Sequence, residues 1–117
     1  MKRGRKKKEN LVDKVVAFII DSELEDLGKL TIKGLAERFA VSHSHLSREF
    51  VAARNMKLRE FVLRVKLLKC AMLMHQNNEI SVKELSNKMG IENPEYFNKV
   101  FKEHFGDAPS RYMRTKN

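Results

Sequence analysis

An internal repeat constrains this sequence more than any other feature. Segment 31–36, Thr-Ile-Lys-Gly-Leu-Ala, matches segment 81–86, Ser-Val-Lys-Glu-Leu-Ser, at an offset of 50 residues. Segment 39–41 matches segment 89–91 at the same offset, and after one added residue the match continues from 46–50 to 97–101. A repeat at a fixed offset predicts two copies of one supersecondary unit.

Each copy has the pattern of a helix-turn-helix. Thr31 and Ser81 are good N-cap residues for the first helix of each copy. A small residue in the turn, Ala40 or Gly90, precedes an apolar residue that plugs the space between the helices. The second helix begins at a capping residue, and in the second copy Asn93 is followed by proline, which is a strong start signal.

The segment between the copies predicts one long helix. Residues 57–76 contain no glycine or proline and carry apolar residues on more than one side, so we expect Leu68, Ala71 and Met72 to be packed. A helix of about 20 residues spans roughly 30 Å. Successive major grooves on one face of a duplex are about 34 Å apart, so such a helix suits a site of roughly 20 base pairs.

The predicted fold is all-α, with about seven helices in two helix-turn-helix subdomains joined by a long linker helix. An apolar stripe over 11–24 predicts the first helix, with Gly28 at its exit in a left-handed conformation. Inward positions in the helix after Ser42 are expected to include Leu46, Phe50, Ala53 and, in part, His45. The expected parts are a basic disordered tail at 1–10, the first subdomain at 11–56, the linker helix at 57–77 and the second subdomain at 78–117.

The net charge of +9, from 24 Lys and Arg against 15 Asp and Glu, points to a polyanionic partner. Nucleic acid is the commonest such partner, and an anionic membrane surface is the competing one. No apolar run approaches the roughly 20 residues of a membrane span, and the basic start has no apolar stretch suited to a signal peptide. We therefore expect a cytoplasmic protein whose tail is either solvated or laid along phosphates.

Motifs for catalysis and for cofactors are missing from the sequence. It has no nucleotide-binding loop, paired catalytic carboxylates or nucleophile motif, so neither an enzyme nor a cofactor is expected. His43 and His45 have no further ligand at suitable spacing, so no metal site is expected. The single cysteine, Cys70, is expected to be buried in the linker helix, and Met72 to fill the core.

Three kinds of function stay open on these grounds. The first is sequence-specific binding of double-stranded DNA, the second is non-specific nucleoid-type DNA binding, and the third is a helical protein-interaction module. Non-specific binding falls steeply with salt and favours no sequence. An interaction module would not retain DNA at physiological salt.

The sequence resembles the DNA-binding domain of AraC/XylS-type transcription regulators. The resemblance is carried by 35–36, 42–50, Ala71, and above all by 90–102 and 106–112, with their Gly-Ile, Tyr-Phe, Phe-Lys, Gly, Pro and Tyr elements. The sequence departs from the usual pattern in having Asn55 for Gly, Ile91 for Phe, Lys66 for Arg, and an inserted Met113.

This resemblance implies a bacterial regulator whose monomeric domain places two recognition helices in adjacent major grooves and activates transcription through RNA polymerase. It also implies that a ligand-binding or receiver domain precedes the domain in many relatives.

Base-reading residues carried over by position are Ser44, Ser47, Arg48, Glu95, Asn98 and Lys99. Helical spacing puts the first three opposite Leu46 and Phe50. Arginine pairs with guanine, glutamate with cytosine and asparagine with adenine. Because the second helix starts with a proline that has no N–H, we expect it to read its half-site more loosely. Expected phosphate contacts at or near helix starts are Thr31, Lys33, His43, Ser81, Lys83, Asn93 and Lys102.

Overall fold

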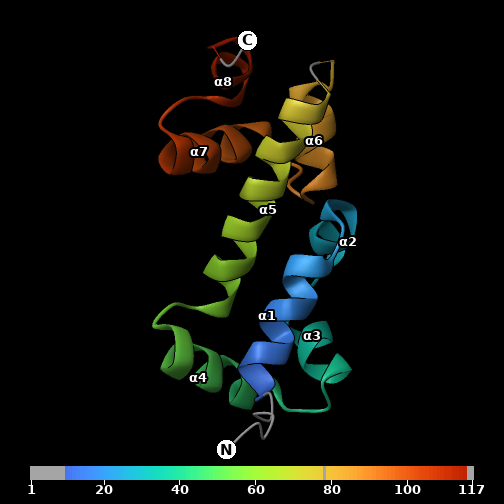
Figure 1. Ribbon diagram of the computed structural model, residues 1–117, viewed down its shortest axis with the longest axis vertical. Coiled ribbons are helices and arrows are strands. Elements are labelled where there is room, and N and C mark those ends of the chain that lie inside the picture. Colours follow the sequence, from blue (N-terminus) through green and yellow to red (C-terminus); the bar gives the residue numbers. More distant parts are fainter. Residues whose placement is uncertain (1–9, 78, 116–117) are drawn as a thin grey trace, which may run out of the picture.

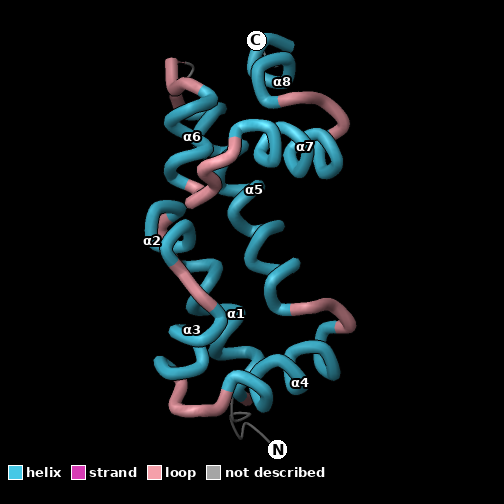
Figure 2. Tube along the Cα trace, turned by 180° about the vertical axis from the view of Figure 1, so that it is seen from behind, coloured by secondary structure: helices cyan, strands magenta, loops and turns pink. Residues whose placement is uncertain are grey.

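The structure, a computed structural model, describes residues 10–77 and 79–115, with side chains to residue 112 (Figures 1 and 2). Within these residues the chain forms eight α-helices and no β-strand, which confirms the all-α class. The helices are α1 Leu11–Asp21, α2 Leu24–Lys29, α3 Ile32–Arg38, α4 His43–Arg54, α5 Leu58–Gln76, α6 Val82–Lys88, α7 Pro94–Phe105 and α8 Pro109–Thr115. The predicted tail lies outside the described residues, apart from Asn10.

Five of these helices begin at a polar side chain that accepts a hydrogen bond from the backbone of the first turn. The capping residues are Asn10, Thr31, Ser42, Ser81 and Asn93, with donor–acceptor distances between 2.8 and 3.0 Å for the shortest bond of each. These bonds satisfy amide groups that a helix start leaves without a partner. Four of the caps are those that the sequence predicts, whereas the fifth, Asn10, is the last residue of the predicted tail.

The first predicted helix is two helices in the structure. Ser22 adopts an extended backbone, and its hydroxyl donates a 2.7 Å hydrogen bond to the carbonyl oxygen of Phe18, which closes α1 at Asp21. The prediction that Gly28 forms a left-handed exit is wrong, because Gly28 lies inside α2 and does not have a positive φ. Its small size serves packing instead: a Cβ atom there would collide with the carbonyl oxygen of Lys88 and lie 2.9 Å from the backbone nitrogen of Gly90.

Two clusters of buried side chains form the core, and α5 contributes to both. Leu58, Val62 and Val65 pack with α1, α3 and α4, whereas Leu67, Cys70 and Met74 pack with α6 and α7. At 100° per residue the buried side of α5 therefore turns by roughly 150° between its two halves. Leu24 of α2, which the sequence assigns to the first subdomain, packs in the second cluster.

This change of side corrects the expectation that Leu68 and Met72 are packed. They continue the stripe formed by Phe61 and Val65, but this stripe is no longer the buried side in the second half of α5, and the two residues are 53% and 56% exposed. Ala71 and Cys70 are buried as expected. In α4, Leu46 and Phe50 are buried, but Ala53 and His45 are exposed rather than inward.

The turns of the two repeats have matching backbone conformations. Ala40 and Gly90, at equivalent positions, have φ angles of 59° and 73°, and the helix-ending residues Asn55 and Gly106 have φ angles of 57° and 89°. The first turn tolerates a side chain, whereas a Cβ atom at Gly90 would collide with the carbonyl group of Gly28. The close approach of α2 to the second turn therefore requires glycine there.

Replacing Gly90 with alanine should destabilise the protein more than replacing Gly106. Both changes put a side chain at positive φ, which costs roughly 1–2 kcal/mol. Only Gly90→Ala also forces backbones apart, which adds roughly 1–3 kcal/mol, because a Cβ atom at Gly106 would meet nothing within 4 Å. Urea unfolding followed by circular dichroism measures both free energies. Equal losses would show that the contact between Gly28 and Gly90 is not tight in solution.

Candidate nucleic-acid interface

Helices α4 and α7, the second helices of the two repeats, lie at opposite ends of α5. Figures 1 and 2, which view the molecule from opposite directions, both show them on the same side of α5, with α2 and α6 on the other side. The molecule is elongated, with extents of 51 × 33 × 22 Å. One face therefore presents both of the helices that the sequence predicts to read bases.

The predicted base-reading residues of α4 lie on its outer side. Ser44 and Arg48 are exposed and Ser47 is half-buried, while Leu46 and Phe50 on the opposite side are fully buried. Within the described residues Arg48 has no ion pair or hydrogen bond, so its guanidinium is free to meet a ligand.

The predicted residues of α7 have the same arrangement. Glu95, Asn98 and Lys99 are exposed, opposite the fully buried Phe97 and Phe101. The N-cap side chain of Asn93 accepts a 2.9 Å hydrogen bond from the backbone N–H of Glu95. Since Pro94 has no N–H, the first turn of α7 offers fewer free donors than a helix start usually does.

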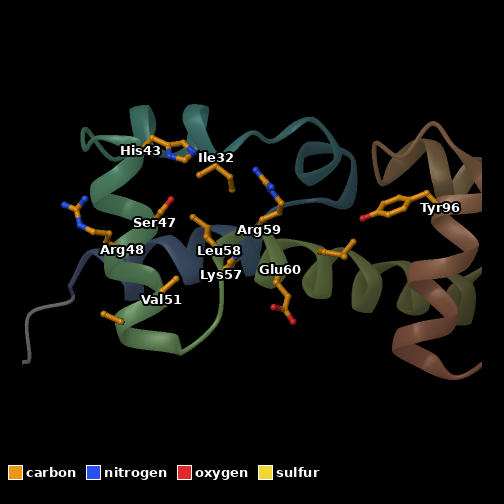
Figure 3. A pocket seen from close by; sticks show the side chains of 12 residues that line it. Ile32, His43, Ser47, Arg48, Val51, Lys57, Leu58, Arg59, Glu60 and Tyr96 are labelled. Atoms are coloured by element: carbon orange, nitrogen blue, oxygen red, sulfur yellow. The ribbon is translucent and has the colours of Figure 1, made fainter.

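A cleft of about 860 Å³ separates α4 from α7 along one flank of α5 (Figure 3). His43, Ser47 and Arg48 line it from α4, and Tyr96, which is 47% exposed, lines its far end from α7. The structure thus brings three predicted residues to one cleft, while Glu95, Asn98 and Lys99 lie outside its lining.

Arg59 and Tyr96 line this cleft, and neither is among the residues that the sequence predicts to contact DNA. Arg59 is in the first turn of α5, and Figure 3 shows it between α4 and the ring of Tyr96. A signal was present in the spacing, because Arg59 and Leu63 share a face that lies off the stripe of Leu58, Val62 and Val65. Without the positions of α4 and α7, that face has no identifiable partner.

The residues predicted to contact phosphate lie at four helix starts, with one exception. Thr31 and Lys33 are at the start of α3, Ser81 and Lys83 at the start of α6, and all four are exposed. His43 is the first residue of α4, and Asn93 caps α7. Lys102 instead lies in the last turn of α7, far from the Asn93 cap, and one helical turn beyond Asn98 on the exposed face.

The starts of α3 and α6 differ in charge although their sequences correspond. Ser81 and Glu84 form a capping box, in which the Glu84 carboxylate accepts a 3.0 Å hydrogen bond from the backbone N–H of Ser81. That bond is the main reason why the pKa of Glu84 is lowered. The equivalent residue in α3 is Gly34, so the start of α3 carries no carboxylate there and is the better place for an anion.

Lys66 fastens the linker helix to the turn of the second repeat. Its Nζ donates a 3.1 Å hydrogen bond to the carbonyl oxygen of Met89, the residue that ends α6. Burial lowers the pKa of Lys66. The bond ties α5 to the turn that leads into α7, which makes Lys66 a positioning residue.

Other reactive groups in the described part of the chain do not form a second site. Burial raises the pKa of the Cys70 thiol to about 12, so almost no nucleophilic thiolate exists at neutral pH. Within 10–77 and 79–115 no three His, Cys, Asp or Glu side chains gather as metal ligands. None of the helices described is long and apolar enough to cross a membrane.

Comparison with known proteins agrees with this arrangement of helices. A family model described as a helix-turn-helix domain matches residues 35–115, which is more than half of the chain. The chain is 29% identical over 85 residues to the Msm operon regulatory protein of Streptococcus mutans, covering 73% of this chain and 30% of that protein. It is 27% identical over 98 residues to the transcriptional activator CfaD of Escherichia coli, covering 84% of this chain and 36% of CfaD.

Among solved structures, the fold matches the DNA-binding domain of AdpA, a global transcriptional factor solved in complex with target DNA. The TM-score is 0.75, with 21% identity over 92% of this chain and 93% of that one. The class is thus a helix-turn-helix DNA-binding domain of a transcription regulator. The chain belongs to the AraC/XylS-type family, and it spans no more than about a third of the first curated relatives it matches.

Replacing Lys66 with methionine should lower the free energy of unfolding by about 1 kcal/mol. The change keeps the apolar stem but removes a charged donor, whose hydrogen bond contributes about 1.5–3 kcal/mol, and methionine recovers part of this by burial. Lys66→Arg should lower the free energy of unfolding less, because it keeps a hydrogen-bond donor. Lys33→Met, at an exposed position, serves as the control and should stay within about 0.5 kcal/mol of wild type in urea unfolding. Equal stability of Lys66→Met and wild type would contradict the fastening role.

Proposed function

We propose that this protein binds a specific double-stranded DNA sequence by placing α4 and α7 in adjacent major grooves and thereby regulates bacterial transcription. The observation that carries this proposal is that α4 and α7 each have an exposed polar face and that both helices lie on the same side of α5. The 19 residues of α5 span roughly 28 Å, close to the separation of about 34 Å between successive major grooves.

In this proposal α4 reads one half-site through Ser44, Ser47 and Arg48. Arg48 is the strongest of the three, because arginine binds both acceptors of guanine in the major groove. Its exposure and its lack of an ion pair within the described residues support this role.

Helix α7 reads the other half-site through Glu95, Asn98 and Lys99. The Glu95 carboxylate accepts from cytosine and the Asn98 amide pairs with adenine. The carboxylate also repels nearby phosphates, and the first turn of α7 has few free donors. We therefore propose that this half-site is read more loosely than the one at α4.

Phosphate contacts are proposed at the helix starts, where free amides and basic side chains favour anions. In the first repeat these are Thr31, Lys33 and His43. In the second repeat they are Ser81, Lys83 and Asn93, with Lys102 further along α7. Contacts of this kind set affinity and register but carry no sequence information.

The whole regulator is proposed to be a cytoplasmic activator that contacts RNA polymerase. CfaD, which carries a similar domain, is a transcriptional activator. A ligand-binding or receiver domain N-terminal to this one would supply the regulatory signal. This chain covers 30% of the Msm regulatory protein and 36% of CfaD, so both relatives have further sequence outside the matched domain.

Arg48→Ala should cost about 1–3 kcal/mol in binding and relax the preference at one base pair. Selection from randomised duplexes by the wild type and by the variant, followed by footprinting, measures both effects. Arg54→Ala, in the last turn of the same helix, is the control and should leave the selected motif unchanged.

Other results of that selection separate the candidate functions. Equal weakening on all duplexes would make Arg48 a phosphate contact. A wild-type protein that enriches no motif would be a non-specific binder, and one that retains no DNA at physiological salt would be an interaction module.

Lys33→Ala should lower affinity more than Lys83→Ala, with the selected motif unchanged in both. Each variant removes one phosphate contact and flattens the salt dependence by about one counterion. The larger loss at Lys33 follows from the Glu84 carboxylate beside Lys83, which already weakens anion binding at α6. Binding titrations at several salt concentrations test the order. A larger loss for Lys83→Ala, or a changed motif, would contradict this assignment.

A further inference from the structure

Arg59 lies at the centre of the cleft between the two proposed recognition helices. It belongs to the first turn of α5, between His43 and Ser47 of α4 on one side and Tyr96 of α7 on the other (Figure 3). Its position is therefore equivalent neither to the base-reading residues nor to the helix-start phosphate contacts. With α4 and α7 in neighbouring grooves, as proposed above, it would face the part of a duplex that lies between the two half-sites.

The guanidinium of Arg59 has no partner within the described residues. The adjacent Glu60 is engaged elsewhere, because its carboxylate pairs with Arg64 at 2.9 Å one turn further along the helix. Arg48 and Lys57 also line the cleft, so the charge around Arg59 is predominantly positive. An exposed, unpaired guanidinium among other basic groups favours an anionic ligand.

Apolar side chains also line the cleft. Ile32, Leu58 and Leu63 lie beside Arg59, and Val51 lies on the α4 wall. A surface that combines basic groups with apolar side chains suits a backbone in which charged phosphates alternate with the C–H surfaces of sugars. On the face of a duplex that presents two successive major grooves, the segment between them is the minor groove, bordered by two such strands.

We propose that Arg59 contacts the sugar–phosphate backbone at the centre of the DNA site, with the Tyr96 hydroxyl as a second donor. This inference rests on the proposed function, since it requires α4 and α7 to occupy neighbouring grooves. The contact holds the middle of the duplex against α5. Affinity then depends on how easily the central base pairs allow that approach, although no side chain reads their edges.

The test uses the duplex that the wild-type protein selects from a randomised pool. Arg59→Ala should weaken binding by about fivefold to tenfold and reduce the salt slope by about one, without changing the motif. Arg59→Lys should bind DNA more tightly than Arg59→Ala but less tightly than the wild type. Tyr96→Phe should reduce the affinity less than Arg59→Ala does. The control is Lys29→Ala, which removes one positive charge from α2, on the other side of α5 from α4 and α7 (Figure 1).

Neutral methylphosphonates placed at the central phosphates complete a double-mutant cycle. They should weaken wild-type binding by at least the same factor as Arg59→Ala, and they should weaken the variant clearly less, because only the Tyr96 hydroxyl still donates there. Methylphosphonates within either half-site should weaken both proteins equally. Circular dichroism confirms that each variant is folded.

The proposal is overturned if Arg59→Ala and Lys29→Ala reduce DNA affinity equally. It is also overturned if central methylphosphonates reduce the affinity of Arg59→Ala as much as that of the wild type. A changed motif in Arg59→Ala would also overturn it, since that result would make Arg59 a base-reading residue. If the wild-type protein selects no motif, the proposed function itself is wrong. That failure is seen before any variant is examined, so the two outcomes are distinct.

Discussion

The fold depends on one helix that is buried on different sides at its two ends. Leu58 and Val62 of α5 belong to the first cluster, and Leu67 and Met74 belong to the second. Because a helix interior is rigid, the turn of roughly 150° between these faces fixes the rotation of one repeat relative to the other. The placement of α4 and α7 on one side of the molecule follows from this rotation. A helix with one continuous buried stripe would direct the two repeats differently.

The linker helix does not set this geometry alone. The α1–α2 segment forms a second connection, since α1 packs in the first cluster and Leu24 of α2 packs in the second. Lys69 reinforces it by donating a 2.7 Å hydrogen bond to the carbonyl oxygen of Ile20, and the Gly28–Gly90 contact joins α2 to the second turn. Two connections resist bending better than one rod. If the protein in the proposed complex does not fit straight DNA, the duplex should therefore bend more than the protein, at a cost of a few kcal/mol.

Most of the helices could be predicted from the sequence because their signals are local. A cap such as Ser81, a turn residue such as Gly90 and the repeat itself act within a few residues, and the structure confirms them. The exposure of Leu68 and the role of Gly28 could not be predicted, because each depends on which helix lies opposite. Arg59 was missed for the same reason: its cleft exists only after α5 has placed α4 and α7.

The two repeats share a fold but present different charges. The first repeat has Gly34 where the second has Glu84, and the outer face of α4 has Ser44 where the first turn of α7 has Glu95. Carboxylates near helix starts satisfy the local amides well, but they weaken the attraction of the same amides for phosphate. In the proposed complex the first repeat therefore supplies most of the electrostatic affinity. The second repeat depends on its rigid attachment to α5 through Lys66, and to α2 through the Gly28–Gly90 contact, to reach its groove. Once the first repeat is bound, that attachment makes binding of the second an intramolecular event, so weak contacts there still add to affinity.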